Sequence, residues 1–235
     1  MIPADLMVMA NRAAVLRTVL RWLLHDMRNP VQVLCLLPEL SAGGGESMEA
    51  GGSRDSIAQL SDRLSLDLAL FDRLLRSPPE PGRARPTAVG DSVRFIDELV
   101  SRSRAPASVD TSVALAAVLP AAATTEEHLD HALLNLVLNA LEAQSEQATR
   151  IAVGADIDGG MLRIWVQDDG PGIAPSVRSG LLTGPLSTKS GHAGLGLLVT
   201  QHLARACGGD LRLGEVSTGT RVDLLLPAWA RTPEG

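Results

Sequence analysis

A histidine beside an acidic residue is the first place where this sequence could do chemistry. His25 and Asp26 are adjacent, and Asn29 follows about one helical turn later. An imidazole flanked by a carboxylate can be held in one tautomer, which leaves its other nitrogen free to attack an electrophile. A histidine on a helix is more often structural, but this setting makes His25 a candidate nucleophile with Asp26 as its base.

Two asparagines one helical turn apart form a second candidate site. Asn135 and Asn139 share a polar arc with His128, His131 and Glu142. Such an outer face is usually only solvated, but asparagine is a poor helix former, so two at this spacing need a reason. Side-chain carbonyls at this spacing can bind Mg²⁺, directly or through its water shell, so Asn139 and Asn135 are both candidate ligands. The opposite face is expected to be core: Leu129, Leu133, Leu136, Val137 and Ala140.

A carboxylate at the end of a predicted strand is the third candidate. Asp168 is followed by Gly170 and Gly172. The glycines permit a turn and close backbone approach. They do not explain Asp168, whose carboxylate could accept a hydrogen bond from the exocyclic amine of adenine.

A glycine-rich segment before a predicted helix is the fourth. It contains Lys189, which is the only lysine of the chain, and then Gly194, Leu195 and Gly196. Free backbone N–H groups at a glycine-rich helix start can bind phosphate. The four segments together predict a nucleotide site and a separate nucleophile.

The nucleophile belongs to the first of two predicted long helices. Apolar residues recur at steps of three and four over residues 6–37, and a second stripe covers residues 57–75. Pro30 removes a helical N–H, so we expect a bend just past His25. Two such stripes cannot both be buried in a lone hairpin, which favours a second copy and a dimeric four-helix bundle. The first stripe is the seam Leu6, Met9, Ala13, Leu16, Leu20, Leu23, Met27, Pro30, Leu34 and Leu37.

A proline-rich stretch divides the chain. We expect an α+β protein with a helical hairpin over residues 1–78, a linker over 79–86 and an α/β sandwich over 87–235. The sandwich is large enough to bury its own core. Its expected helices are 91–101, 125–143 and a helix ending near 206, and its expected strands are 109–119, 150–157, 161–166, 211–214 and 220–225.

The composition limits the classes of function. The 235 residues are 45% hydrophobic and 20% charged with a net charge of −6, which is typical of a folded chain and unlike a nucleic-acid-binding one. No apolar run approaches the roughly 20 residues of a membrane span, and no signal peptide is recognisable. We expect a soluble, cytoplasmic protein.

The four segments, in this order, resemble the boxes of two-component sensor histidine kinases. The His25 segment is similar to their H-box, and the Asn135, Asp168 and Gly194 segments are similar to the N, G1 and G2 boxes of the GHKL ATP-binding fold. The resemblance implies that Mg²⁺-ATP binds the second domain and that His25 takes the γ-phosphoryl group. It also implies transfer to a response-regulator aspartate, and Asp26 with Asn29 resembles the family's phosphatase motif.

One position separates the branches of this fold. ATP-hydrolysing members carry a glutamate where this chain has Asn135, an amide that cannot act as a base. The resemblance therefore implies transfer to a side chain rather than to water. The chain departs from the family by lacking the usual lid phenylalanine in 181–186, by His192 in place of the first G2 glycine and by Glu142 in place of a basic residue.

Two other functions fit the same organisation. One is a non-catalytic phosphotransfer adaptor with a degenerate ATP pocket, and the other is an anti-sigma-type serine kinase, which would not need the His25 hairpin. The first helix begins near residue 1. We therefore expect the signal to arrive through a partner such as a separate sensor protein, through the helix itself or through redox chemistry. The apolar stripes of the hairpin favour a homodimer.

Overall fold

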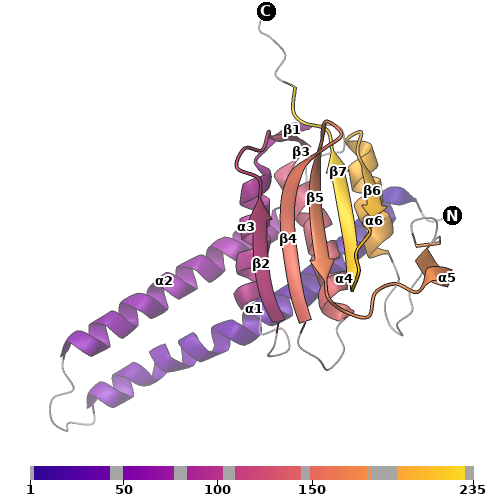
Figure 1. The fold of residues 1–235 in the computed structure, drawn as a ribbon. Helices are drawn as coiled ribbons and strands as arrows, with labels where there is room; N and C mark the ends of the chain where they lie inside the picture. The colour runs from indigo at the N-terminus through magenta and orange to yellow at the C-terminus, as the bar shows by residue number, and fades with distance from the viewer. Residues whose placement is uncertain are drawn as a thin grey trace, which may run out of the picture.

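Six helices and seven strands are described in a computed structural model (Figure 1). It describes residues 3–42, 50–76, 84–102, 109–143, 149–178, 180–181 and 195–230. The helices are α1 Ala4–Ala42, α2 Ala50–Leu75, α3 Val89–Arg102, α4 Glu126–Glu142, α5 Pro175–Arg178 and α6 Gly196–Ala206. The strands are β1 Arg85–Thr87, β2 Val109–Leu115, β3 Ala122–Thr124, β4 Thr149–Asp158, β5 Met161–Asp168, β6 Asp210–Leu213 and β7 Thr220–Leu226.

A five-stranded mixed sheet organises the second half of the chain. Its order is β2-β4-β5-β7-β6, in which β2 and β4 are parallel and every other pair is antiparallel. The parallel pair requires a crossover, and α4 lies in that connection between β2 and β4. We call residues 84–230 the sheet domain, and α1 with α2 the hairpin.

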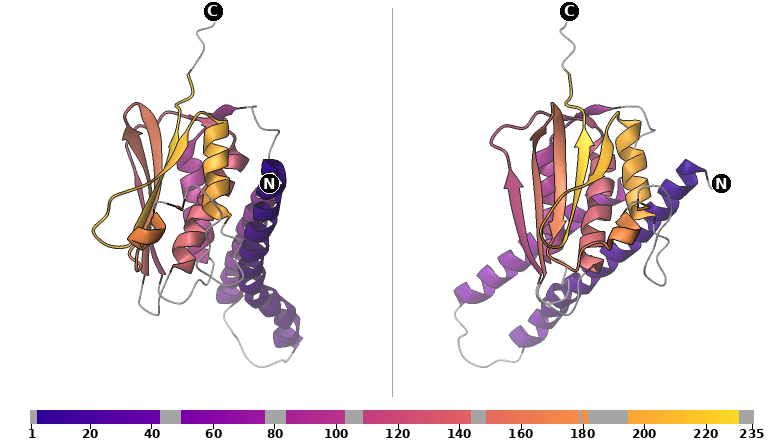
Figure 2. Two further views of the ribbon diagram at one scale, coloured as in Figure 1. Left: turned by 90° about the vertical axis from the view of Figure 1, so that its right-hand side faces the viewer. Right: turned by 45° about the vertical axis from the view of Figure 1, so that its right-hand side comes forward.

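The molecule is layered (Figure 2). The sheet forms one layer, α3, α4 and α6 cover one of its faces, and the hairpin lies against the outside of these helices. Alternation along β5 places Leu162, Ile164 and Val166 toward the helices, where each is at most 3% exposed. The predicted apolar face of α4 is confirmed, since all five of its residues are buried.

The hairpin packs differently from the predicted seam. Leu6 and Met9, at two seam positions, are 57% and 68% exposed. The buried stripe consists of Val15 and Val19, which are not seam positions, and of Leu23, which is one; these three residues follow at steps of four, and the stripe faces the sheet domain and α2. Helix α1 therefore has two apolar faces. Within one chain, the sheet domain and α2 cover the face of the buried stripe, and the face that carries Leu6 and Met9 stays exposed.

Several predicted boundaries were wrong. The expected strand over residues 109–119 ends at Leu115, and two short strands were missed because each has only three residues. These are β1 and β3, which pair antiparallel, so residues 85 and 86 of the expected linker are in a strand. Helix α1 continues five residues past Leu37, the last predicted seam position, to Ala42.

Candidate functional site

Helix α4 carries the two candidate asparagines, and its start is fixed by a side-chain cap. The Thr125 hydroxyl accepts a hydrogen bond from the backbone N–H of His128 at 3.3 Å, which satisfies one of the free donors of the first turn. Two acidic residues in that turn favour the same helix end. Two and three turns later, Asn135 is buried and Asn139 half-buried.

The start of α6 lies directly against these asparagines. A Cβ atom at Gly196 would lie 3.3 Å from Asn135 Oδ1 and 3.5 Å from both Asn139 Nδ2 and Asn139 Oδ1. A side chain at residue 196 would therefore press against the Asn135 amide and touch that of Asn139. Leu195, at the N-cap of α6, is half-buried beside them.

Asp168 ends β5 and is held by backbone donors. Its Oδ1 accepts hydrogen bonds from the N–H of Gly170 at 2.9 Å and of Thr220 at 3.3 Å. Burial raises the pKa of this carboxyl group, and the two N–H groups oppose that change. Gly172 and Gly219 both have positive φ and their backbones approach each other closely, so this loop requires glycine at both positions.

The three motifs meet at one edge of the sheet domain. A Cβ atom at Gly170 would lie 3.5 Å from the carbonyl oxygen of Ala143, the residue that ends α4. The Asp168 loop thus adjoins the end of the asparagine helix, whose middle adjoins the start of α6. Among the described residues, Asn139 Nδ2 is buried without a hydrogen-bond partner, which is a polar atom that a bound ligand could satisfy. The arrangement suits a polar ligand such as a nucleotide with its cation.

The hairpin also reaches this region, which the sequence did not predict. Asn11 of α1 is 9% exposed, and its Oδ1 lies 2.9 Å from both His131 Nε2 and Asn135 Nδ2. Part of the polar arc of α4 is therefore buried under α1 rather than solvated. The only sequence signal was an asparagine within a long helix, four residues before the buried stripe.

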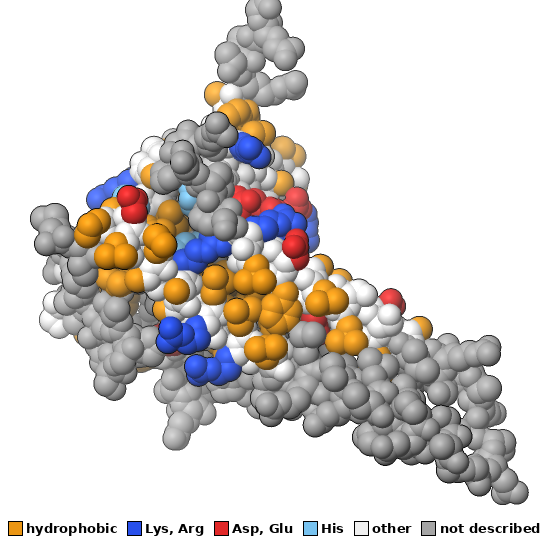
Figure 3. Space-filling model, turned by 180° about the vertical axis from the view of Figure 1, so that it is seen from behind, with side chains coloured by type: hydrophobic (Ala, Val, Ile, Leu, Met, Phe, Trp, Pro, Cys, Tyr) orange, Lys and Arg blue, Asp and Glu red, His pale blue; other side chains and the backbone are white. Residues whose placement is uncertain are grey.

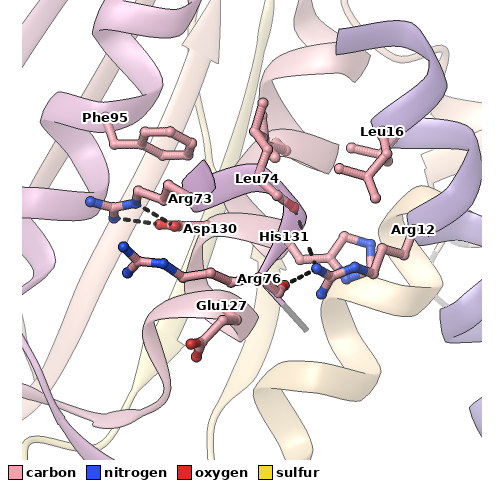
Figure 4. A pocket seen from close by; sticks show the side chains of 11 residues that line it. Arg12, Leu16, Arg73, Leu74, Arg76, Phe95, Glu127, Asp130 and His131 are labelled. Carbon is pink, nitrogen blue, oxygen red and sulfur yellow. Dashed lines mark hydrogen bonds and ion pairs between the residues drawn. The ribbon is translucent and has the colours of Figure 1, made fainter. Parts of the chain in front are cut away.

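A second polar contact joins the end of α2 to α4. Arg73 forms a two-pronged pair with Asp130, with Nε and Nη2 donating to the two carboxylate oxygens at 2.7 Å and 2.9 Å (Figure 4). The guanidinium also stacks on Phe95, 4.3 Å from the ring centroid. Arg12 donates to the backbone carbonyls of Leu74 and Arg76 (Figure 4). These contacts surround a small cavity between the hairpin and the sheet domain.

His131 is a neutral member of this region. Burial lowers its pKa to about 4, and the positive charge of Arg12 and the neighbouring His128 act in the same direction. Burial also lowers the pKa of His128, against the opposing charge of Glu127. The uncharged ring of His131 can donate from one nitrogen only, and Asn11 is the partner of that nitrogen.

The other predicted site residues lie outside what the structure describes. The backbone of His25, Asp26 and Asn29 is helical within α1, but their side chains are not among the described ones. Lys189 and Gly194 lie in residues 182–194, as do His192 and most of the predicted lid. The three boxes of the sheet domain are therefore brought together, and their relation to the side chain of His25 stays a prediction.

Within the described ranges, no helix combines the length and apolar character that crossing a membrane requires.

A family model matches the sheet domain. Residues 124–230 match the model described as histidine kinase-, DNA gyrase B-, and HSP90-like ATPase. That segment contains the three boxes that meet at the edge of the sheet domain, from Asn135 to Gly196.

Curated relatives match nearly the whole chain. The C4-dicarboxylate transport sensor protein DctB of Rhizobium meliloti is 31% identical over 224 residues, which are 91% of this chain and 35% of that protein. The sensor histidine kinase ZraS of Escherichia coli K12 is 27% identical over 86% of this chain and 43% of its own length. The chain thus spans less than half the length of these two relatives.

Solved structures agree with the fold. Full-length ShkA in complex with AMPPNP matches 92% of this chain and 47% of its own, with a TM-score of 0.56 and 26% identity. The catalytic domain of histidine kinase ThkA matches 62% of this chain and 96% of its own, with a TM-score of 0.56 and 19% identity, which shows the fold alone.

Proposed function

Because residues 124–230 belong to the histidine kinase-, DNA gyrase B-, and HSP90-like ATPase family and nearly the whole chain is related to sensor histidine kinases, we propose that this protein is an ATP-dependent protein-histidine kinase. It phosphorylates His25 from Mg²⁺-ATP and passes the phosphoryl group to an aspartate of a response regulator. The proposal keeps the predicted division into a phosphotransfer hairpin over residues 1–78, a linker from residue 79 and a catalytic domain, but the linker ends before residue 85, where β1 begins.

The meeting of Asn135, Asn139 and Gly196 is the observation that carries the nucleotide site. Three residues from two distant segments lie within van der Waals reach, and the Asn139 amide nitrogen has no hydrogen-bond partner among the described residues. Mg²⁺, when bound, would neutralise charge on the phosphate oxygens. Asn139 supplies an amide oxygen to it, with Asn135 as a second candidate ligand, while Asp168 accepts a hydrogen bond from adenine.

The remaining nucleotide residues act around the phosphates and the base. Gly170 and Gly172 shape the loop after Asp168, and the backbone of Gly194, Leu195 and Gly196 with Lys189 binds the phosphate oxygens. Because Asn135 has no acid–base function, the site does not activate water.

Transfer to His25 is a substitution at phosphorus. A ring nitrogen of His25 attacks the γ-phosphorus, a nitrogen–phosphorus bond forms, and the bond to the bridging oxygen of ADP breaks. Asp26 accepts the proton that leaves the ring. Asn29 lies one helical turn from Asp26. We propose that the protein also dephosphorylates the response regulator, and that Asn29 positions the water that removes the phosphate.

The partners follow from the hairpin and the reaction. The exposed apolar positions of α1 and α2 favour a homodimer that pairs two hairpins. A receiver domain is the acceptor, and histidine kinase ThkA has been solved in complex with the response regulator TrrA. ATP as the donor places the reaction in the cytoplasm, and a separate sensor protein is a candidate source of the signal.

The direct test is labelling with γ-labelled ATP and Mg²⁺. We expect acid-labile, base-stable label on the wild type, and none on His25→Ala or Asn139→Ala. His202→Ala, which removes a histidine elsewhere in the described sheet domain, should label normally.

The other outcomes separate the alternatives. Label that survives acid and persists in His25→Ala would support a serine kinase. A protein that neither labels nor binds ATP would overturn the kinase and leave the phosphotransfer adaptor.

A further inference from the structure

A buried polar cluster crosses from the hairpin to the nucleotide helix. Asn11, His131 and Asn135 are 9%, 4% and 3% exposed. The Asn11 carbonyl oxygen accepts from Asn135 Nδ2 and lies equally close to His131 Nε2, each at 2.9 Å. Because an amide oxygen only accepts, His131 must donate from Nε2, and its Nδ1 has no partner among the described residues.

This cluster is satisfied only when α1 lies on α4. Removing the Asn11 oxygen would leave two buried donors unpaired, which costs free energy. When the two helices separate, water solvates the same donors. Asn11 therefore contributes to docking of the hairpin on the sheet domain, in addition to the apolar residues Val15 and Leu16, which line the cavity shared with Leu134 of α4.

The position of this contact along α1 conflicts with the transfer reaction. Asn11 and His25 are fourteen residues apart on one continuous helix, which is about 21 Å along its axis. Phosphoryl transfer needs reacting atoms roughly 3–3.5 Å apart. A triphosphate bound beside Asn135 does not extend that far. In a parallel pair of hairpins, His25 of a second copy lies at the same height along the axis, so transfer between copies meets the same obstacle.

We propose that the Asn11–His131–Asn135 cluster is a latch that holds the sheet domain in a resting position, from which His25 is out of reach. This inference rests on the proposed kinase function, and it adds a contact that restrains autophosphorylation. The contact must break before the sheet domain moves along the hairpin to His25.

The neighbouring Arg73–Asp130 pair does not serve as this latch. Arg73 lies four residues before residue 77, where the connection to the sheet domain begins. A contact so close to the covalent connection permits large movements of the domain. Asn11, on the other helix, restrains them.

The first test compares autophosphorylation rates. Asn11→Ala should weaken docking about ten-fold or more, because it leaves two buried donors unpaired. We expect its rate of His25 phosphorylation to rise about five-fold or more if the docked state predominates. Asn11→Asp retains an acceptor for both donors and should stay within about two-fold of the wild type. Arg17→Ala, at an exposed position of the same helix, should change nothing.

A distance measurement tests the latch without any activity. Spin labels are attached at Ala14→Cys and Arg212→Cys, which are both exposed positions, and the distance between them reports whether α1 lies on the sheet domain. The native cysteines are replaced by serine, and labelled chains are diluted with unlabelled ones so that only distances within one chain are measured. We expect one short distance in the wild type and Asn11→Asp, and a broad, longer distribution in Asn11→Ala.

The two readouts separate the two proposals. An unchanged distribution in Asn11→Ala overturns the latch, whatever the kinase does. If Asn11→Ala is active and broadens the distance distribution without raising the rate of His25 phosphorylation, the cluster does not restrain phosphoryl transfer. If no variant autophosphorylates, the proposed function fails, and the distances still decide whether Asn11 holds the two parts together.

Discussion

The sheet domain and the hairpin differ in how far their leucine side chains are exposed. In the sheet domain, Leu133 and Leu162 are fully buried within one chain. In the hairpin, Leu24 and Leu68 are 60% and 61% exposed, and apolar side chains gather along the described parts of its two helices (Figure 3). The apolar core of the sheet domain is therefore covered within one chain, whereas the hairpin leaves one apolar face for a second molecule to cover.

The largest expected effect is in the core of the sheet domain. Leu133→Ala should lower the free energy of unfolding by about 2–5 kcal/mol, because a cavity forms where no solvent enters. Leu68→Ala should change it by less than about 0.5 kcal/mol in the monomer. Chemical denaturation of both variants, at concentrations that keep the chain monomeric, measures the difference. Equal losses would contradict the contrast between the two regions.

The next effect concerns association of the hairpin. Leu68→Glu should weaken self-association about 100-fold, or about 3 kcal/mol, because a charge would have to be buried between helices. Analytical ultracentrifugation over a concentration series measures it.

The matched control is a charge on an exposed apolar position of the sheet domain. Val118 is 81% exposed, and Val118→Glu should leave association unchanged. A Leu68→Glu variant that associates like the wild type would show that the exposed face of the hairpin is not the dimer interface.

The contact that joins the two regions should have a smaller effect. Arg73→Ala leaves Asp130, whose side chain is 9% exposed, without its two-pronged partner, and should cost about 2–3 kcal/mol. Thermal unfolding measures the loss. Arg94→Ala breaks a pair that is 66% and 57% exposed and should cost less than about 1 kcal/mol. A similar cost for both would show that burial of the Asp130 pair is unimportant.

The smallest expected effect is the pH dependence from His131. Its folded pKa of about 4 lies below the ordinary 6.5, so the unfolded chain takes up a proton that the folded one refuses. Stability therefore falls as the pH drops from about 6.5 toward 4, by about 2 kcal/mol between pH 7 and pH 5 for this group. Denaturation at both pH values measures it.

A variant without the imidazole assigns the effect. His131→Gln should lose most of this pH dependence, and a remainder is expected because the pKa of His128 is lowered in the same direction. A wild type whose stability is constant between pH 7 and pH 5 would show that His131 is solvated.

The sequence predicted what depends on local pattern. The apolar face of α4 and the strand ending in Asp168 follow from spacing alone, and both agree with the structure. The packing of the hairpin was harder to predict, because α1 has two apolar faces. The regular spacing of the seam that contains Leu6 and Met9 made that face the expected buried one. Nothing local shows that the sheet domain covers the other face.

The polar contacts between distant segments were not predictable. Asn11 and His131 are separated by 120 positions, and a single asparagine in a helix does not name its partner. The same holds for Arg73 and Asp130, each of which is an ordinary surface residue by sequence. Such pairs exist only once the hairpin has docked.

The order of the sheet has a consequence for synthesis on the ribosome. β5 pairs with β4 and also with β7, the last strand, which ends at Leu226. The hairpin is complete at Leu75, 151 residues earlier. Synthesis proceeds at roughly 5–20 residues per second, so the apolar stripes of the hairpin stay exposed for about 8–30 seconds before the sheet domain that covers one of them can fold. A nascent hairpin therefore meets other chains, or chaperones, before it meets its own sheet.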